Sequence, residues 1–252
     1  MEQIQTIYEG LHNLFKAGQR PAAEFVYEKA APESCCDHII WEGERIPVLE
    51  WRYSKKYYGV YSTLPRLGEL SMLKTLDFAP NTRTLAQELF REMDLAEFLL
   101  QSRVKSIMGF GTEQAANFIV RMQNGTLMNL ETAVTMPAEA RREVKHTVFT
   151  TNGMASDMVV DNVVVQDQIH VFNNGRHSTN YTDDDINLFG LSLEEQDTCY
   201  AIYALLDNRE DKEAWKRQEQ WLIPLVAGAL SALRTGEKYV APERAPWEEE
   251  SC

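Results

Sequence analysis

Short runs of strand-forming residues alternate with turn signals along the middle of the chain. Residues 117–120 and 127–130 are largely apolar, and they flank Asn124-Gly125. Asn-Gly readily adopts the positive φ values of a hairpin turn whose twist matches that of its strands. Runs of the same kind occupy residues 104–111, 145–151 and 158–165. Parallel strands need long crossover connections, so strands spaced this closely predict an antiparallel sheet.

Helical periodicity is found on both sides of this region. Apolar positions recur at helical spacing in residues 2–17 and 85–100. Ser192 and Glu195 form a capping-box pattern that predicts a helix to about residue 206. Residues 211–233 predict a further helix, with Pro224 as a place for a kink. The polar face of the 85–100 helix carries Glu88, Arg91, Glu92, Asp94 and Glu97.

The remaining patterns predict shorter elements. Residues 55–58 interleave Lys with Tyr, which suits either a solvated strand face or the stacking of single-stranded nucleic acid. A short hairpin is expected around residues 166–168, and a polar loop over 173–188. Asp183 to Asp185 in that loop form a solvated turn rather than a metal site, because three adjacent carboxylates do not converge on one ion. Strands are expected at 23–27, 39–41, 47–53, 68–78 and 238–240.

Composition narrows the class of protein. The 252 residues carry a formal charge of −13 and are 44% hydrophobic and 25% charged, as in an ordinary globular protein. Net negative charge disfavours binding to nucleic acid or to anionic membranes. No apolar run approaches the roughly 20 residues of a membrane span, and no secretory signal opens the chain, so a cytoplasmic location is expected.

The four cysteines indicate free thiols. Cys35, Cys36, Cys199 and Cys252 show no metal-ligand spacing, so no metal is expected. A redox pair of the adjacent Cys35 and Cys36 is the alternative, but it requires strained geometry. Reduced thiols in a reducing compartment are therefore the favoured interpretation.

The beginning of the chain predicts half of a βαβ unit. A helix ending at Ala17-Gly18 leads to the short strand at 23–27. The sequence contains no Gly-x-Gly-x-x-Gly, the turn that cradles a dinucleotide pyrophosphate.

Several segments, taken in order, resemble the Gfo/Idh/MocA family of glucose–fructose oxidoreductase and inositol dehydrogenase. Phe25 to Lys29 resembles the family's strand ending in Glu-Lys-Pro, although Ala30 replaces the proline. Asp94 to Leu100 resembles the end of its substrate-domain helix. The other similar segments are residues 15–18, 67–70, 117–131, 146–157 and 230–236.

The resemblance implies an α+β fold built on a large, mainly antiparallel open sheet covered on one face by helices. Residues 1–65 would be a remnant of the Rossmann half with its connecting segment, residues 66–240 the sheet domain, and residues 241–252 a disordered acidic tail. The nucleotide-binding part of the Rossmann domain would be missing. Family members use NAD(P) to oxidise or reduce a sugar or polyol, and they often associate through the open sheet face.

The resemblance also implies roles for four residues. Lys29 would polarise the reacting hydroxyl, and Asp94 would orient it or accept its proton; Glu28 and Arg91 would bind substrate. Arg91 stands where the family has its acid/base histidine, and an arginine cannot shuttle protons near neutral pH. The structural alternative is an exposed helix face for Arg91 and Asp94 and a solvated strand end for Lys29.

Two functions follow as hypotheses. The first is an oxidoreductase-family protein that is not an autonomous dehydrogenase and binds no cofactor by itself. It would either take NAD(P) with the help of a nucleotide-binding partner chain or act on a sugar-like ligand without a standard cofactor. The second is a non-catalytic domain that binds a sugar- or polyol-like ligand or serves in homo-oligomer assembly through its open sheet face.

Overall fold

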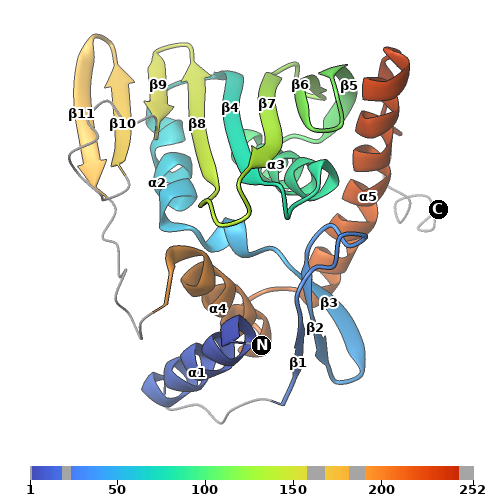
Figure 1. The fold of residues 1–252 in the computed structure, drawn as a ribbon. Helices are drawn as coiled ribbons and strands as arrows, with labels where there is room; N and C mark the ends of the chain where they lie inside the picture. The colour runs from blue at the N-terminus through green and yellow to red at the C-terminus, as the bar shows by residue number, and fades with distance from the viewer. Residues whose placement is uncertain (1, 19–23, 158–167, 182–190, 244–252) are drawn as a thin grey trace, which may run out of the picture.

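A nine-stranded mixed sheet dominates the computed structural model, which describes residues 2–18, 24–157, 168–181 and 191–243 (Figure 1). Its strand order is β11-β10-β9-β8-β4-β7-β6-β5-β12. The strands are β4 (Leu70–Pro80), β5 (Val104–Gly111), β6 (Ala115–Met122), β7 (Leu127–Met136), β8 (Glu143–Thr150), β9 (Gly153–Ser156), β10 (Gln168–Asn173), β11 (Arg176–Tyr181) and β12 (Tyr239–Val240).

The expected α+β class with a large sheet is confirmed, with one correction to its topology. β4 pairs in parallel with β7, while the other neighbours in this sheet are antiparallel. Helix α3 (Leu85–Leu100) and the β5–β6 hairpin together supply the long crossover between the parallel strands. This crossover was not predicted, because the expectation of an antiparallel sheet rested only on the short turns between consecutive strands.

One face of the large sheet is covered by helices α2 (Lys55–Thr63), α3 and α5 (Lys212–Thr235) (Figure 1). Two glycines allow the close approach of α5. A Cβ on Gly228 would lie 2.5 Å from the Tyr239 ring, and one on Gly109 would lie 3.0 Å from the Leu233 Cα atom. On the other face, large apolar side chains of the described strands remain exposed, namely Phe78, Met108, Phe110, Ile119 and Leu127.

A smaller layer lies beside the large sheet (Figure 1). It holds helices α1 (Glu2–Ala17) and α4 (Leu193–Leu206), and the antiparallel strands β1 (Val26–Glu28), β2 (Asp37–Trp41) and β3 (Glu44–Val48). The 3₁₀ helix η1 (Glu50–Tyr53) contacts α4, α3 and α2, and so joins the two layers; the 3₁₀ helix η2 (Leu64–Arg66) follows α2. The long helix α5 reaches from β3 in the small layer to β5 in the large sheet.

Several local predictions are confirmed. The helices at 2–17 and 85–100 have the expected bounds, and the β6–β7 hairpin turns at Asn124-Gly125, although only Gly125 has the expected positive φ, of 91°. Ser192 and Glu195 form the expected capping box, and Pro224 lies inside α5. The cysteines at positions 35, 36 and 199 are free thiols.

Other local predictions are wrong. Residues 55–58 begin α2 and bury Lys56 and Tyr57, so they are not a solvated strand face. Residues 50–53 form a 3₁₀ helix instead of a strand. Residues 176–181, expected as part of a loop, form strand β11, which pairs with β10 across a turn at Asn174-Gly175. The hairpin expected around 166–168 lies mostly outside the described residues. The strand expected at 158–165, the turn at Asp183 to Asp185 and most of the expected acidic tail lie outside the described residues.

No helix in the described ranges combines the length and apolar character that crossing a membrane requires.

Candidate functional site

The polar face of α3 is buried. Glu88, Arg91, Glu92, Asp94 and Glu97 are each 9% exposed or less. The helix contacts β4 and β7 of the sheet, η1, and α5, so its charged stripe is enclosed between these elements. The interpretation of Arg91 and Asp94 as an exposed helix face is therefore wrong. A buried charge is costly unless it is paired, so each of these groups needs a partner.

Arg142, immediately before β8, is the centre of one buried ion-pair network. Its Nη2 atom lies 2.9 Å from Asp77 Oδ1 and 2.8 Å from Glu92 Oε1, and its Nε donates to Glu88 Oε2 at 2.6 Å. Burial opposes ionisation of Glu88, but Arg142 and Arg83 outweigh it and lower the pKa of Glu88 to about 2. Burial raises the pKa of Asp77 to about 7 despite the attraction of Arg142.

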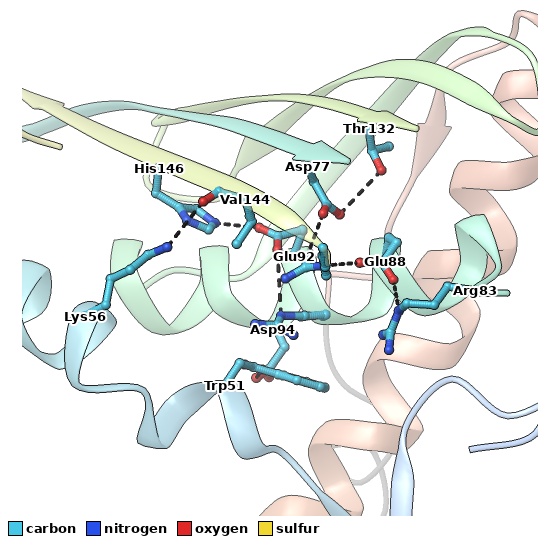
Figure 2. Close-up of polar contacts among 12 residues, drawn as sticks. Trp51, Lys56, Asp77, Arg83, Glu88, Glu92, Asp94, Thr132, Val144 and His146 are labelled. Carbon is cyan, nitrogen blue, oxygen red and sulfur yellow. Dashed lines mark hydrogen bonds and ion pairs between the residues drawn. The ribbon is translucent and has the colours of Figure 1, made fainter. Parts of the chain in front are cut away.

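The network continues along β8 to His146 (Figure 2). His146 Nε2 lies 2.7 Å from Glu92 Oε2, and Nδ1 lies 3.8 Å from Asp157 Oδ2. Burial disfavours the imidazolium, yet the neighbouring Tyr57, Glu92 and Asp157 prevail and raise the pKa of His146 to about 10. Lys56 pairs with Asp157 at 2.5 Å and donates to the Val144 carbonyl at 3.3 Å. His146, which looks isolated in the sequence, therefore belongs to a buried chain of polar contacts whose acidic members raise its pKa.

Asp94 holds η1 against α3. Its Oδ2 atom accepts hydrogen bonds from Trp51 Nε1 at 2.6 Å and from Arg52 Nε at 2.8 Å, and its Oδ1 atom accepts one from Arg52 Nη2 at 2.5 Å. The carboxylate is fully buried. Asp94 thus fixes the orientation of the Trp51 indole, which is one wall of a neighbouring cavity.

Two cavities lie where the small layer meets η1 and α3. The Lys29 cavity has a volume of about 280 Å³, and the Arg91 cavity one of about 100 Å³. The polar and aromatic lining of the Lys29 cavity includes Tyr27, Lys29, Asp37, Glu50, Trp51, Thr82, Arg83, Gln87, Glu194, Glu195 and Thr198. The charged lining of the Arg91 cavity comprises Glu50, Lys56, Arg91, Arg141, Arg142, Glu194 and Asp197. Glu50 and Glu194 line both cavities, so the two are adjacent.

Glu50 is one of the two carboxyl groups that line both cavities. Its residue is 8% exposed, and its Oε2 atom has no hydrogen-bond partner among the described residues. Burial and the charge of Asp37 raise the pKa of Glu50 to about 8, against the attraction of Arg91. Glu50 therefore exchanges a proton near neutral pH, which is the range useful for general acid–base chemistry.

Arg91 lines the smaller cavity. Its side chain is 10% exposed, and its guanidinium lies 5.7 Å from the centre of the Trp51 ring. The Nε atom is 4.0 Å from Glu92 Oε1 and has no hydrogen-bond partner in the described part of the chain. A buried guanidinium with an unused donor favours an anionic ligand group.

The four residues singled out from the sequence fall in different places. Lys29 lines the larger cavity and Arg91 the smaller one, and Glu50 is common to both. Asp94 lines neither cavity and lies behind Trp51. Glu28 forms an exposed ion pair with Arg45 at 3.0 Å. The catalytic roles of Lys29 and Asp94 and the substrate-binding roles of Glu28 and Arg91 stay predictions.

Comparison with known proteins identifies the fold. No protein-family model and no curated protein matches the chain. An oxidoreductase from Agrobacterium radiobacter in complex with NAD⁺, L-tartaric acid and magnesium matches with a TM-score of 0.60 and 14% identity, covering 76% of this chain and 63% of that one. A myo-inositol dehydrogenase from Corynebacterium glutamicum matches at 0.56 and 11%, covering 78% and 64%. A levoglucosan dehydrogenase in complex with NADH and L-sorbose matches at 0.57 and 8%, covering 78% and 65%.

These matches show that the chain shares a fold with oxidoreductases of this kind. At 8–14% identity they show the fold alone. The chain spans 63–65% of the length of these structures.

Proposed function

We propose that this chain binds a sugar- or polyol-type ligand bearing an acidic group in the Lys29 and Arg91 cavities, and that it is not a dehydrogenase on its own. The observation that carries the proposal is the adjacency of two cavities with different chemistry. They meet at Glu50 and are lined by Lys29 on one side and Arg91 on the other.

The larger cavity suits the hydroxyl groups of a polyol. It offers several acceptors, among them Asp37, Glu194 and Thr198, together with the donor Lys29. The Trp51 and Tyr27 rings add apolar surface for the carbon skeleton. Its volume of about 280 Å³ is near the lower end of the range for small-molecule pockets.

The smaller cavity suits the acidic group of the ligand. Four cationic side chains line it against three acidic ones. Arg91 is one of these cations, its Nε has no hydrogen-bond partner among the described residues, and a guanidinium recognises a carboxylate through charge-assisted hydrogen bonds. In support, one fold neighbour was crystallised with L-tartaric acid and another with L-sorbose, a hydroxy acid and a sugar.

A dehydrogenase reaction would need a nucleotide site from another source, because the sequence has no Gly-x-Gly-x-x-Gly. In that case a nucleotide-binding partner chain would supply NAD(P). In support, two of the fold neighbours form complexes with NAD⁺ and with NADH. Lys29 would polarise the reacting hydroxyl, and Glu50, at the junction of the cavities, would exchange its proton. Asp94 would act as a positioning residue through Trp51.

Titration with NADH and NADPH, followed by nicotinamide fluorescence, separates these alternatives. We expect no saturable binding up to millimolar cofactor and no absorbance change at the nicotinamide band with sugars or polyols. Binding at low micromolar concentration, together with turnover, would contradict the claim that the chain is not a dehydrogenase on its own.

Substitution of Arg91 tests the anionic subsite. Arg91→Met should weaken the binding of D-gluconate by about tenfold to a hundredfold, because a hydrogen bond to a charged group contributes about 1.5–3 kcal/mol. Calorimetry measures this change. Arg121→Met, an exposed arginine on β6, should bind like the wild type. Equal affinities of the two variants for D-gluconate would show that Arg91 does not contact the ligand.

We also propose that two copies of the chain associate through the uncovered face of the large sheet. This proposal is supported by the exposed apolar side chains of neighbouring strands. Met108 and Ile119 lie opposite each other in the β5–β6 pair, and both are more than a third exposed. Phe110 and Leu127, on β5 and β7, extend the same apolar surface. Contiguous exposed apolar side chains of this kind are typical of a protein–protein interaction surface.

Light scattering at increasing protein concentration tests the association. We expect a dimer or larger species that becomes monomeric in Ile119→Lys, because a charge at the centre of an apolar contact is left without a partner. Ile223→Lys, an equally exposed position on α5, should leave the species unchanged. A wild-type protein that stays monomeric at high concentration would contradict the proposal.

A further inference from the structure

Three metal-ligating side chains converge between β2 and α5, next to the Lys29 cavity. Cys36 Sγ, His38 Nε2 and a Glu219 carboxylate oxygen all lie within 4.8 Å of one another. His38 Nε2 is 2.7 Å from Glu219 Oε1, and Cys36 Sγ is 3.8 Å from the same oxygen. Cys36 and His38 are 4% and 1% exposed.

The distances approach those of a tetrahedral zinc site. With Zn–S of about 2.3 Å and Zn–N and Zn–O of about 2.0–2.2 Å, the ligand atoms would be about 3.4–3.6 Å apart. The Cys36–Glu219 distance needs little change, and the His38–Glu219 pair must open by roughly 0.7 Å to admit the ion. Glu219 is on the exposed side of the cluster, with a side-chain exposure of 19%, and can make this movement.

We propose that Cys36, His38 and Glu219 form a Zn²⁺ site with three protein ligands and an open fourth position. A thiolate, a neutral imidazole and a carboxylate are a donor set that suits zinc. Their summed charge of −2 balances Zn²⁺, so the occupied site is neutral, as a buried position requires.

Two of the ligands are close together in the chain, because Cys36 directly precedes β2 and His38 lies in it. Cys36 and His38 are two residues apart, and both side chains point towards Glu219 Oε1. Asp37 between them points elsewhere, accepting hydrogen bonds from the Ala30 amide at 2.7 Å and from the Tyr27 hydroxyl. His38 Nδ1 has no hydrogen-bond partner among the described residues, so the ring proton can move to Nδ1 and leave the Nε2 lone pair for the metal.

The Lys29 cavity gives the ion a path of entry, because Cys36 lines it. Water or another small ligand would take the open position. This site does not depend on the proposed binding of an acidic polyol, because it is tested with the metal alone.

Cobalt titration of the full chain, stripped with a chelator, tests the site. We expect one equivalent of Co²⁺ to give a thiolate-to-cobalt charge-transfer band in the near ultraviolet, and Zn²⁺ to displace it. Zn²⁺ should also protect one thiol from alkylation. Cys36→Ser should abolish the band, and Glu219→Gln should weaken zinc binding at least tenfold.

Cys199→Ser is the matched control, because Cys199 is another buried thiol and lies on α4, outside the cluster. It should retain the band and the stoichiometry. Circular dichroism checks that each variant is folded. Absence of the band in the wild type, or its survival in Cys36→Ser, would overturn the proposal and leave His38 and Glu219 as a simple ion pair.

Discussion

Replacing Arg142 with methionine should lower the free energy of unfolding by about 3–5 kcal/mol, the cost of removing one partner from a buried ion pair. The guanidinium contacts Asp77, Glu88 and Glu92 at 2.6–2.9 Å, and all three carboxylates belong to residues with no exposed surface. Methionine fills similar space but leaves these groups without their shared cation. Urea denaturation of the purified variant measures the loss.

Two further variants make this result specific. Arg141→Met changes the neighbouring arginine, which is exposed, and should stay within about 0.5 kcal/mol of the wild type. In the double variant Arg142→Met with Glu88→Gln, the loss should be smaller than the sum of the two single losses, because one uncompensated charge is gone. Equal stability of Arg141→Met and Arg142→Met would contradict a buried network centred on Arg142.

Raising the pH from 7 to 9 should destabilise the protein by about 1.4 kcal/mol per pH unit through His146. The pKa of His146 is raised from 6.5 to about 10 in the folded chain. Between these values the native protein keeps a proton that the unfolded chain has released, so stability falls as the pH rises. The stabilisation of the folded protein by protonated His146 is fully present below pH 6.5 and is lost as the pH rises to about 10.

The groups that face His146 identify the source of this slope. Glu92 and Asp157 lie at its two ring nitrogens, the Tyr57 ring meets it edge-on at 4.9 Å, and Lys56 pairs with Asp157.

His146→Gln should be less stable than the wild type at pH 7, and its slope between pH 7 and 9 should be smaller by about 1.4 kcal/mol per pH unit. The slope that remains near pH 7–8 comes from groups such as Glu50 and Asp77, whose pKa values are raised to about 8 and about 7. Urea denaturation at a series of pH values measures the stability and the slope. An unchanged slope in His146→Gln would show that His146 is neutral in the native protein.

The sequence predicted the elements that depend on local signals. The turn at Asn124-Gly125, the capping box at Ser192 and the periodicity of 85–100 each act within a few residues, and each is confirmed. The parallel pairing of β4 with β7 was missed, because the helix and hairpin between them had to be recognised as one crossover. The α2 helix was missed because two lysines next to two tyrosines suggested a solvated strand face. In the structure Lys56 is buried, and its charge is paired with Asp157.

The site was predictable only in part, because contacts between residues remote in sequence leave no local signal. Lys29 and Arg91 were singled out by the family resemblance, and both line cavities. Glu50, Arg142 and the ligands of the proposed zinc site were missed, because their partners are remote in sequence. Glu92 and His146 are 54 residues apart, and His38 and Glu219 are 181 apart. No pattern of residue types within a short segment reports such pairs; only the packing of α3 and α5 brings them together.

Calorimetric titration with D-gluconate and D-sorbitol tests the proposed function most directly. The two ligands share a six-carbon polyol skeleton and differ in one terminal carboxylate. We expect D-gluconate to bind at one site per chain and D-sorbitol to bind at least tenfold more weakly, because only the acid can use the Arg91 donor. Equal affinity for the two ligands, or no binding of either, would contradict an anionic polyol site at the junction of the two cavities.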